Sequence, residues 1–161
     1  ENLFKHVNID MNKTFVPSGC TDDLKAEGLA YDKMIEDLGG IDIQLLGIGT
    51  NGHIGFNEPG DSFKDIPFPV KLTQSTIESN RKYFEAVGDT MPEYALTMGI
   101  GDIMRAKKII LIATGASKAK AVKALVEGEV TAECPASILK LHSDVTVFLD
   151  NDSAALLGER K

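Results

Sequence analysis

The sequence of 161 residues contains no tryptophan and only two cysteines, Cys20 and Cys134. These cysteines lie far apart and form neither a CxxC motif nor a disulfide framework, so we expect two reduced thiols with a structural role. No apolar run approaches the roughly 20 residues that a membrane helix needs. The first ten residues also lack the basic start and apolar centre of a signal peptide. These absences predict a cytoplasmic protein that does not span a membrane.

Positive charge is scarce as well. The sequence has 17 Lys and Arg against 24 Asp and Glu, a net charge of −7. Basic residues occur in short pairs such as Arg81-Lys82 and Lys107-Lys108 rather than in a stripe, so a nucleic-acid partner is not expected. A phosphorylated sugar remains possible, because one or two cations and a helix N-terminus are enough to bind a phosphate.

Strand and helix signals alternate along the chain. Short apolar runs predict strands over residues 41–46, 94–98, 108–114 and 144–149. Amphipathic or capped segments predict helices over residues 23–38, 73–86, 101–106, 116–127 and 135–141, with a last helical turn or two over 151–157. Thr21 or Asp22 is the expected cap of the first helix, and Thr73 the expected cap of the second.

Two segments give no such signal. Residues 1–20 suggest the end of a helix, a short extended piece and a loop, and residues 61–70 contain too many prolines for a helix or a central strand. The alternation elsewhere predicts one α/β domain over residues 1–161. We expect a Rossmann-like, open and mostly parallel sheet with helices on both faces.

The stretch of residues 41–60, IDIQLLGIGTNGHIGFNEPG, is the most informative part of the chain. A strand-length apolar run leads into a loop with several glycines, one proline and the polar side chains of Asn51, His53, Asn57 and Glu58. The carboxyl ends of strands in open α/β sheets are where ligands bind. We therefore expect the functional site in this loop.

Residues 47–52 also match the GxGxxG pattern of a dinucleotide site. That site requires a helix to begin inside the loop, so that its N-terminus meets the pyrophosphate. Here residues 54–60 are poor helix sequence, and no acidic residue ends a second strand about 20 positions later. The pattern is therefore not interpreted as a dinucleotide site.

His53 and Glu58 favour acid–base chemistry. Imidazole is suited to moving protons near neutral pH, and a neighbouring carboxylate can orient the ring and stabilise its charged form. The amide of Asn51 can bond a ring nitrogen or a substrate hydroxyl but cannot act as a base. The alternative is that His53 only caps the loop while Glu58 is solvated. His6 and His142 lack such a setting and are expected to be structural.

Residues 115–118, Gly-Ala-Ser-Lys, form a second candidate site. They join a predicted buried strand to a helix N-terminus, where backbone N–H groups and the helix dipole favour a phosphate, and Lys118 would add a positive charge. The alternative is an ordinary helix start with a surface lysine.

The strings LLGIGTNGHIGFNEPG, SNRKYF, YALTMGIGDI, ATGASKAKAV and LHSDVTV occur in this order along the chain. Together they resemble glucosamine-6-phosphate deaminases over essentially all 161 residues. The related phosphogluconolactonases share the fold and a similar Gly-His loop, but not the Phe-Asn-Glu-Pro continuation.

The resemblance implies an enzyme that converts glucosamine 6-phosphate and water into fructose 6-phosphate and ammonium, with no metal or organic cofactor. It implies that His53 is the acid and base of ring opening, supported by Glu58 and Asn51. It also assigns Gly52, Lys82 and Lys118 to substrate and phosphate binding.

Three departures from the family pattern stand out. Lys82 occupies a position where members often carry a phosphate-binding arginine, and lysine lacks the two-pronged guanidinium. Phe68 stands where effector-activated hexameric members carry an arginine, which counts against allosteric control. The family's enolisation base and first phosphate loop precede the position of Glu1. We therefore expect that these residues lack the N-terminal part of the family fold and are inactive alone. The oligomeric state stays open between a monomer and a homo-oligomer.

Two other functions remain possible. One is a 6-phosphogluconolactonase, and the other is a non-catalytic sensor of sugar phosphates, since related folds occur in transcriptional regulators. The segment from Phe68 to Gly99, bounded by proline and glycine, is in addition a candidate lid over the site.

Overall fold

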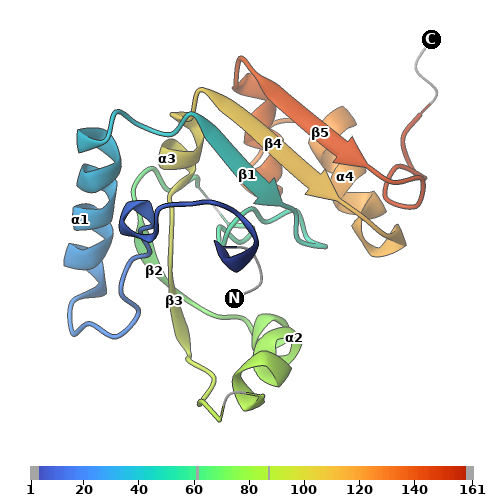
Figure 1. The fold of residues 1–161 in the computed structure, drawn as a ribbon. Helices are drawn as coiled ribbons and strands as arrows, with labels where there is room; N and C mark the ends of the chain where they lie inside the picture. The colour runs from blue at the N-terminus through green and yellow to red at the C-terminus, as the bar shows by residue number, and fades with distance from the viewer. Residues whose placement is uncertain (1–3, 61, 87, 159–161) are drawn as a thin grey trace.

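A three-stranded parallel sheet forms the centre of the computed structural model, which describes residues 4–60, 62–86 and 88–158 (Figure 1). Its strands are β1 (Ile43–Gly47), β4 (Lys108–Ala113) and β5 (Val145–Leu149). β4 lies in the middle and pairs in parallel with both neighbours. Because β4 and β5 are parallel, the chain must cross back between them, and it does so through helical segments.

The helices follow the predicted pattern closely. They are α1 (Leu24–Asp37), α2 (Gln74–Glu85), α3 (Ile100–Met104) and α4 (Ala119–Glu127), with 3₁₀ helices at Phe4–His6, Met11–Lys13, Ala116–Lys118 and Pro135–Leu141. Thr73 caps α2 as predicted, since its hydroxyl accepts the N–H of Thr76. The predicted cap of α1 is wrong: Asp23 accepts the N–H of Ala26, and Thr21 instead accepts the N–H of Asp23.

A separate antiparallel hairpin carries α2. Its strands are β2 (Phe68–Lys71) and β3 (Tyr94–Thr97). The sequence did not predict β2, although the strand agrees with the proline rule because it is an edge strand that contains Pro69. α1 packs against this hairpin so closely that a Cβ on Gly28 would lie 3.1 Å from Cβ of Pro67 and 3.2 Å from Cδ1 of Leu96.

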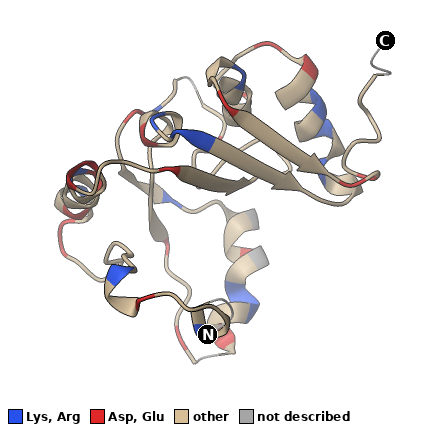
Figure 2. Cartoon of the chain, turned by 45° about the horizontal axis from the view of Figure 1, so that its top comes forward, with Lys and Arg blue, Asp and Glu red and all other residues tan. Residues whose placement is uncertain are grey.

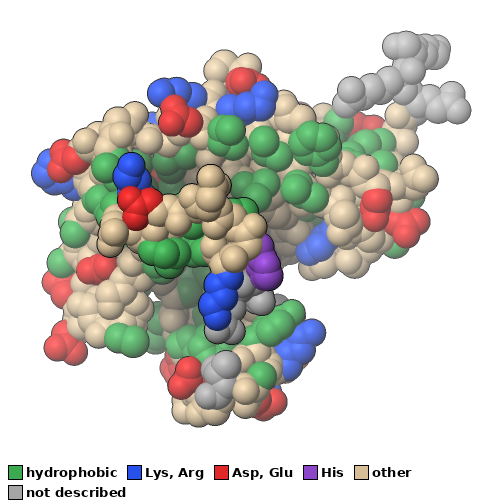
Figure 3. Space-filling view, viewed as in Figure 1, with side chains coloured by type: hydrophobic (Ala, Val, Ile, Leu, Met, Phe, Trp, Pro, Cys, Tyr) green, Lys and Arg blue, Asp and Glu red, His purple; other side chains and the backbone are tan. Residues whose placement is uncertain are grey.

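The hydrophobic core lies on one face of the parallel sheet. Ile109 and Leu111 alternate along β4 and are fully buried. Val122 of α4 and Leu139 of the last 3₁₀ helix, which is behind the sheet in the view of Figure 1, belong to the same core cluster. On the opposite face, apolar side chains gather over the strands and remain exposed (Figure 3). These are Ile43, Leu45, Ile112 and Phe148.

The predicted α/β fold, with a mostly parallel sheet flanked by helices, is confirmed. Residues 151–156 form hydrogen-bonded turns rather than a regular helix, in keeping with the predicted last helical turn or two, and the N–H of Ala154 donates to the carbonyl of Asp150 at 3.1 Å. The Ser153 hydroxyl donates to the carbonyl of Ala113 at 2.9 Å, and the Ser153 N–H binds the Asp150 side chain. These bonds hold the segment against the end of β4.

Both cysteines are free thiols, as expected, with Cys20 exposed and Cys134 buried. Lys and Arg occupy several separate elements and are interspersed with Asp and Glu (Figure 2). None of the helices in the described residues has the length and apolar composition that crossing a membrane requires.

Candidate active site

The loop that follows β1 is folded tightly on itself. The N–H of Gly49 donates to the carbonyl of His53 at 2.8 Å, and the N–H of Gly52 donates to the carbonyl of Gly49 at 3.0 Å. Gly52 has a φ of 88°, a conformation that favours glycine. No helix begins between residues 47 and 60, so the loop lacks the feature that a dinucleotide site requires.

Three predicted side chains meet in this loop. Nδ2 of Asn51 donates to Oε2 of Glu58 at 2.7 Å, and Oε1 of Glu58 lies 3.3 Å from Nδ1 of His53. The His53–Glu58 contact has an ion-pair distance but not the geometry of a hydrogen bond, because the buried Nδ1 makes no hydrogen bond with the residues that the structure describes. The Glu58 carboxylate is thus held between an amide and an imidazole.

Asn51 supports the loop differently from the prediction. Its amide bonds neither ring nitrogen of His53; it fixes Glu58 through Nδ2, and its Oδ1 accepts the backbone N–H of His53 at 3.2 Å. The side chains of His53 and Glu58 are 27% and 21% exposed, so both are largely buried yet open to a ligand. The alternative with a solvated Glu58 is therefore wrong.

The imidazole of His53 lies directly on Gly49. A Cβ at Gly49 would come within 2.3–2.5 Å of three ring atoms. Because real Cβ atoms do not approach so closely, only glycine leaves room for the ring in this position. The glycines of the loop therefore shape the site as well as the turn.

A hollow of about 480 Å³ opens in front of His53. Lys118 also lines it, so the structure brings together the two candidate sites predicted from separate parts of the chain. Helix α2 contributes Thr76 and Asn80 to the lining. The remaining lining residues come from the β1 loop and are Gly47, Ile48, Gly49, Thr50, Gly55 and Phe56.

The loop that carries Lys118 begins with Gly115, at a φ of 88°. The Asp150 carboxylate accepts the N–H of Gly115 at 2.9 and 3.1 Å. Hydrogen bonds from Ser153, and then from Gly115, hold the pKa of Asp150 below its usual range. Since that N–H is occupied, a phosphate here would rely on the other N–H groups of the turn and on Lys118.

Two predicted binding residues do not line this hollow. Nζ of Lys82 lies 4.9 Å from the ring centroid of Tyr83, and Lys82 follows Asn80 by two positions, so the two side chains point to different sides of α2. Gly52 is buried, its carbonyl accepts the N–H of Ala136, and a Cβ there would lie 2.6 Å from Sγ of Cys134. Gly52 therefore packs the loop against the last 3₁₀ helix.

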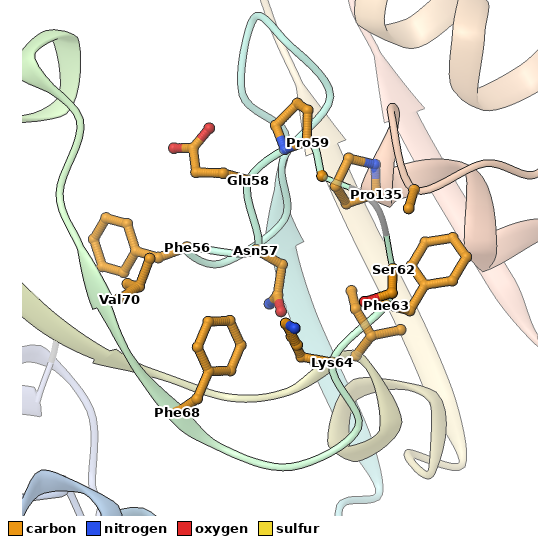
Figure 4. Close-up of a pocket in the computed structure, with 13 residues that line it drawn as sticks. Phe56, Asn57, Glu58, Pro59, Ser62, Phe63, Lys64, Phe68, Val70 and Pro135 are labelled. Atoms are coloured by element: carbon orange, nitrogen blue, oxygen red, sulfur yellow. The ribbon is translucent and has the colours of Figure 1, made fainter.

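A second hollow, of about 310 Å³, lies along residues 56–60 and is lined by Glu58 and Lys64 among others (Figure 4). Phe68 lines it as well, and its aromatic ring supplies no charge for a phosphate. Among the residues that the structure describes, no group of three or more His, Cys, Asp and Glu could hold a metal ion.

Sequence reasoning missed three residues at the site, Thr76, Asn80 and Thr97, and it placed Asn57 in the loop without giving it a role. Thr76 and Asn80 lie four positions apart on α2, and this spacing puts them on one face of the helix. That spacing was the available signal, but nothing in the sequence placed α2 beside the loop. Thr97 and Asn57 tie the loop to β3 and are considered below.

Comparison with known proteins gives a consistent result. The family model for glucosamine-6-phosphate isomerases and 6-phosphogluconolactonases matches residues 1–148. The chain is 51% identical over 156 residues to a glucosamine-6-phosphate deaminase of Clostridium perfringens, and 48% identical over 156 residues to glucosamine-6-phosphate deaminase 1 of Bacillus subtilis. Each alignment covers 97% of this chain and 64% of the relative, so the chain spans about 64% of the length of these relatives.

Solved structures agree. That of a monomeric glucosamine-6-phosphate deaminase superposes with a TM-score of 0.88 at 49% identity, over 96% of this chain and 64% of the other. A 6-phosphogluconolactonase from Thermotoga maritima has a TM-score of 0.67 at 13% identity, over 91% of this chain and 60% of the other, which shows a shared fold alone. The chain therefore belongs to the family of glucosamine-6-phosphate isomerases and 6-phosphogluconolactonases.

Proposed function

We propose that this chain carries the ring-opening site of a glucosamine-6-phosphate deaminase. The observation that carries the proposal is the arrangement of Asn51, Glu58 and His53 in one loop, beside a hollow that Lys118 also lines. Relatives named glucosamine-6-phosphate deaminase, about half identical to this chain, support the same reaction. The full reaction converts glucosamine 6-phosphate and water into fructose 6-phosphate and ammonium.

His53 is the proposed acid and base of ring opening. Opening a cyclic sugar requires a proton to leave the anomeric hydroxyl and a proton to reach the ring oxygen. One imidazole can perform both transfers in turn. Glu58 stabilises the charged imidazolium between these transfers, because its carboxylate lies 3.3 Å from Nδ1. Asn51 keeps that carboxylate in place and adds no charge of its own.

Phosphate binding is assigned to Lys118 and, in the second place, to Lys82. Lys118 lines the hollow together with His53, so it can hold one end of the sugar phosphate while the other end reaches the imidazole. Lys82 would reach the hollow only after α2 turned. Gly52 contributes to binding through the shape of the loop. We assign no enolisation base within these residues.

Further aspects of this proposal concern the setting of the enzyme. We propose a cytoplasmic protein that uses no metal or organic cofactor, acts on a small sugar phosphate, binds neither nucleic acid nor membrane, and exists as a monomer or a homo-oligomer. The single domain of residues 1–161 is proposed to be inactive by itself, since the relatives that it matches are longer.

The test is the release of ammonium from glucosamine 6-phosphate, with the intact mass recorded on the same sample. It is made on the 161-residue chain and on the same chain together with any residues that flank it in its natural protein. We expect release by the longer form, and a loss of about 10²-fold or more in kcat for His53→Gln. Activity of the 161-residue chain alone would show that our expectation of an inactive domain is wrong.

His142→Gln is the matched control. The His142 imidazole bonds the carbonyl of Ala106 and the N–H of Asp144, outside the hollow. It should leave ammonium release unchanged. Hydrolysis of 6-phosphogluconolactone without ammonium release would replace the proposal by a lactonase. Stabilisation by sugar phosphates without turnover in either assay would replace it by a sensor.

A further inference from the structure

The Thr97 side chain contacts the loop of residues 47–60 that follows β1, called the catalytic loop below, although Thr97 belongs to another element. Thr97 ends β3, is 6% exposed, and lies 41 positions after Phe56. Its hydroxyl oxygen accepts the N–H of Phe56 at 3.0 Å and donates to the carbonyl of Met98 at 3.3 Å. The donor of Phe56 is satisfied by this hydroxyl, so the loop depends on a side chain that is distant in sequence.

Asn57 makes a second connection, in which a side chain of the loop bonds the backbone beside β3. It is 5% exposed, and its Nδ2 donates to the carbonyl of Ile54 at 3.0 Å and to that of Met98 at 2.9 Å. Figure 4 shows the Asn57 side chain pointing away from that of Glu58. Because these bonds hold the Asn57 side chain inside the protein, the carboxylate of the next residue, Glu58, points outward.

These two connections are the hydrogen bonds by which residues 54–58 are tied to other segments, as far as the described part of the chain goes. Gly55 allows the approach: with a φ of 58°, it would place a Cβ 3.0 Å from Oγ1 of Thr97. The Glu58 side chain, as far as the described residues show, bonds Asn51 of the same loop and pairs with His53, and the Glu58 backbone N–H donates to the carbonyl of Phe56 at 3.1 Å. Its position therefore depends on where the backbone of residues 56 and 57 is held.

We propose that Thr97 and Asn57 are positioning residues for the reaction, which couple the β2–β3 hairpin to the catalytic loop and keep Glu58 against His53. The inference rests on the proposed function. Because α2 lies between β2 and β3 in the chain and lines the hollow, a movement of the hairpin is transmitted to Glu58 through the hydroxyl of Thr97. Neither residue lines the hollow in front of His53.

Thr97→Val is the decisive variant, because valine keeps the shape and removes the hydroxyl. We expect kcat for ammonium release to fall about tenfold or more through the misplaced carboxylate, while KM stays within about twofold. Thr97→Ser, which restores the hydroxyl, should recover most of the lost kcat. Thr146→Val is the matched control, since Thr146 is half-buried in β5 and its hydroxyl has no hydrogen bond in the described residues.

A second readout is independent of turnover. The imidazole proton signals of His53, identified by their absence in His53→Gln, should shift in Thr97→Val and return in Thr97→Ser. The charged groups facing this ring are Glu58 and Lys118. Thr97→Ala also removes the hydroxyl and leaves only a small methyl side chain. It is used in place of Thr97→Val if melting curves show that the valine variant is unfolded.

The outcomes separate the two proposals. If the natural protein releases no ammonium but the His53 signals shift as expected, the proposed function fails and the positioning role of Thr97 stands. If ammonium is released and folded Thr97→Val changes neither kcat nor the His53 signals, the positioning role is overturned. A loss that Thr97→Ser does not restore also overturns it, because the hydroxyl would then not be the cause.

Discussion

Gly49 leaves the space in which the His53 ring lies. In Gly49→Ala the new Cβ would come 2.3–2.5 Å from Nδ1, Cε1 and Nε2 of that ring, so the imidazole must move away from Glu58. We expect kcat for ammonium release to fall about 10²-fold, because a displacement of about 1 Å has that effect on an oriented catalytic group. Gly19→Ala is the control, since a Cβ there meets nothing within 4 Å. Equal activity of both variants would contradict the assigned ring position.

Asp102 shows how a buried carboxylate affects stability. Its side chain accepts the N–H of Gly99 and pairs with Arg105, which also pairs with Asp32. Burial raises the pKa of Asp102 from 3.8 to about 6. The folded chain then binds this proton more tightly than the unfolded chain, so the free energy of unfolding falls as the pH rises from about 4 to about 6 and reaches its lower level just above that range.

Asp102→Asn removes this titration. Between pH 5 and pH 7 the free energy of unfolding of the natural chain should fall by about 1 kcal/mol relative to that of the variant. Urea denaturation at both pH values measures the difference. A difference between the two proteins that does not change with pH would show that Asp102 is already ionised at pH 5.

At the scale of elements, the parallel strands and most helices could be predicted, because their signals are local. β4 is an unbroken apolar run, and Thr73 marks the start of α2 by its own side chain. β2 could not be predicted, since a strand with Pro69 is stable only beside β3, a partner 26 positions further on. The side of α2 that faces the hollow could not be predicted from the sequence either, because it depends on how the hairpin is placed.

The orientation of α2 leads to a prediction about the two lysines. Lys118 lines the hollow, whereas Lys82 lies over the Tyr83 ring. We expect Lys118→Met to weaken binding of inorganic phosphate about tenfold, as for the loss of a charged hydrogen-bond partner, and Lys82→Met to weaken it much less. Titration calorimetry with both variants measures this. Equal losses would show that α2 turns on binding and brings Lys82 to the phosphate.

At the scale of the whole molecule, the site divides into a predictable and an unpredictable part. Asn51, His53 and Glu58 lie within eight residues of one loop, so their proximity in space could be predicted from the sequence. The contacts of Thr97 with Phe56 and of Gly52 with Cys134 join segments that are 41 and 82 positions apart, and no local pattern marks them. They follow only from packing the hairpin and the last 3₁₀ helix around the loop.

The same division should appear in the stability of the molecule. β4 is paired on both sides and holds the fully buried Ile109 and Leu111, whereas α2 has no completely buried side chain among those described. Amides of α2 should therefore exchange at least about 10²-fold faster than those of β4, through local opening.

Hydrogen exchange followed by mass spectrometry measures these exchange rates, with and without glucosamine 6-phosphate. Since Thr76 and Asn80 line the hollow, the sugar phosphate should slow exchange in α2 and leave the rate of the exposed segment Met11–Lys13 unchanged. Equal exchange of α2 in both samples would mean that the hairpin does not close over the site.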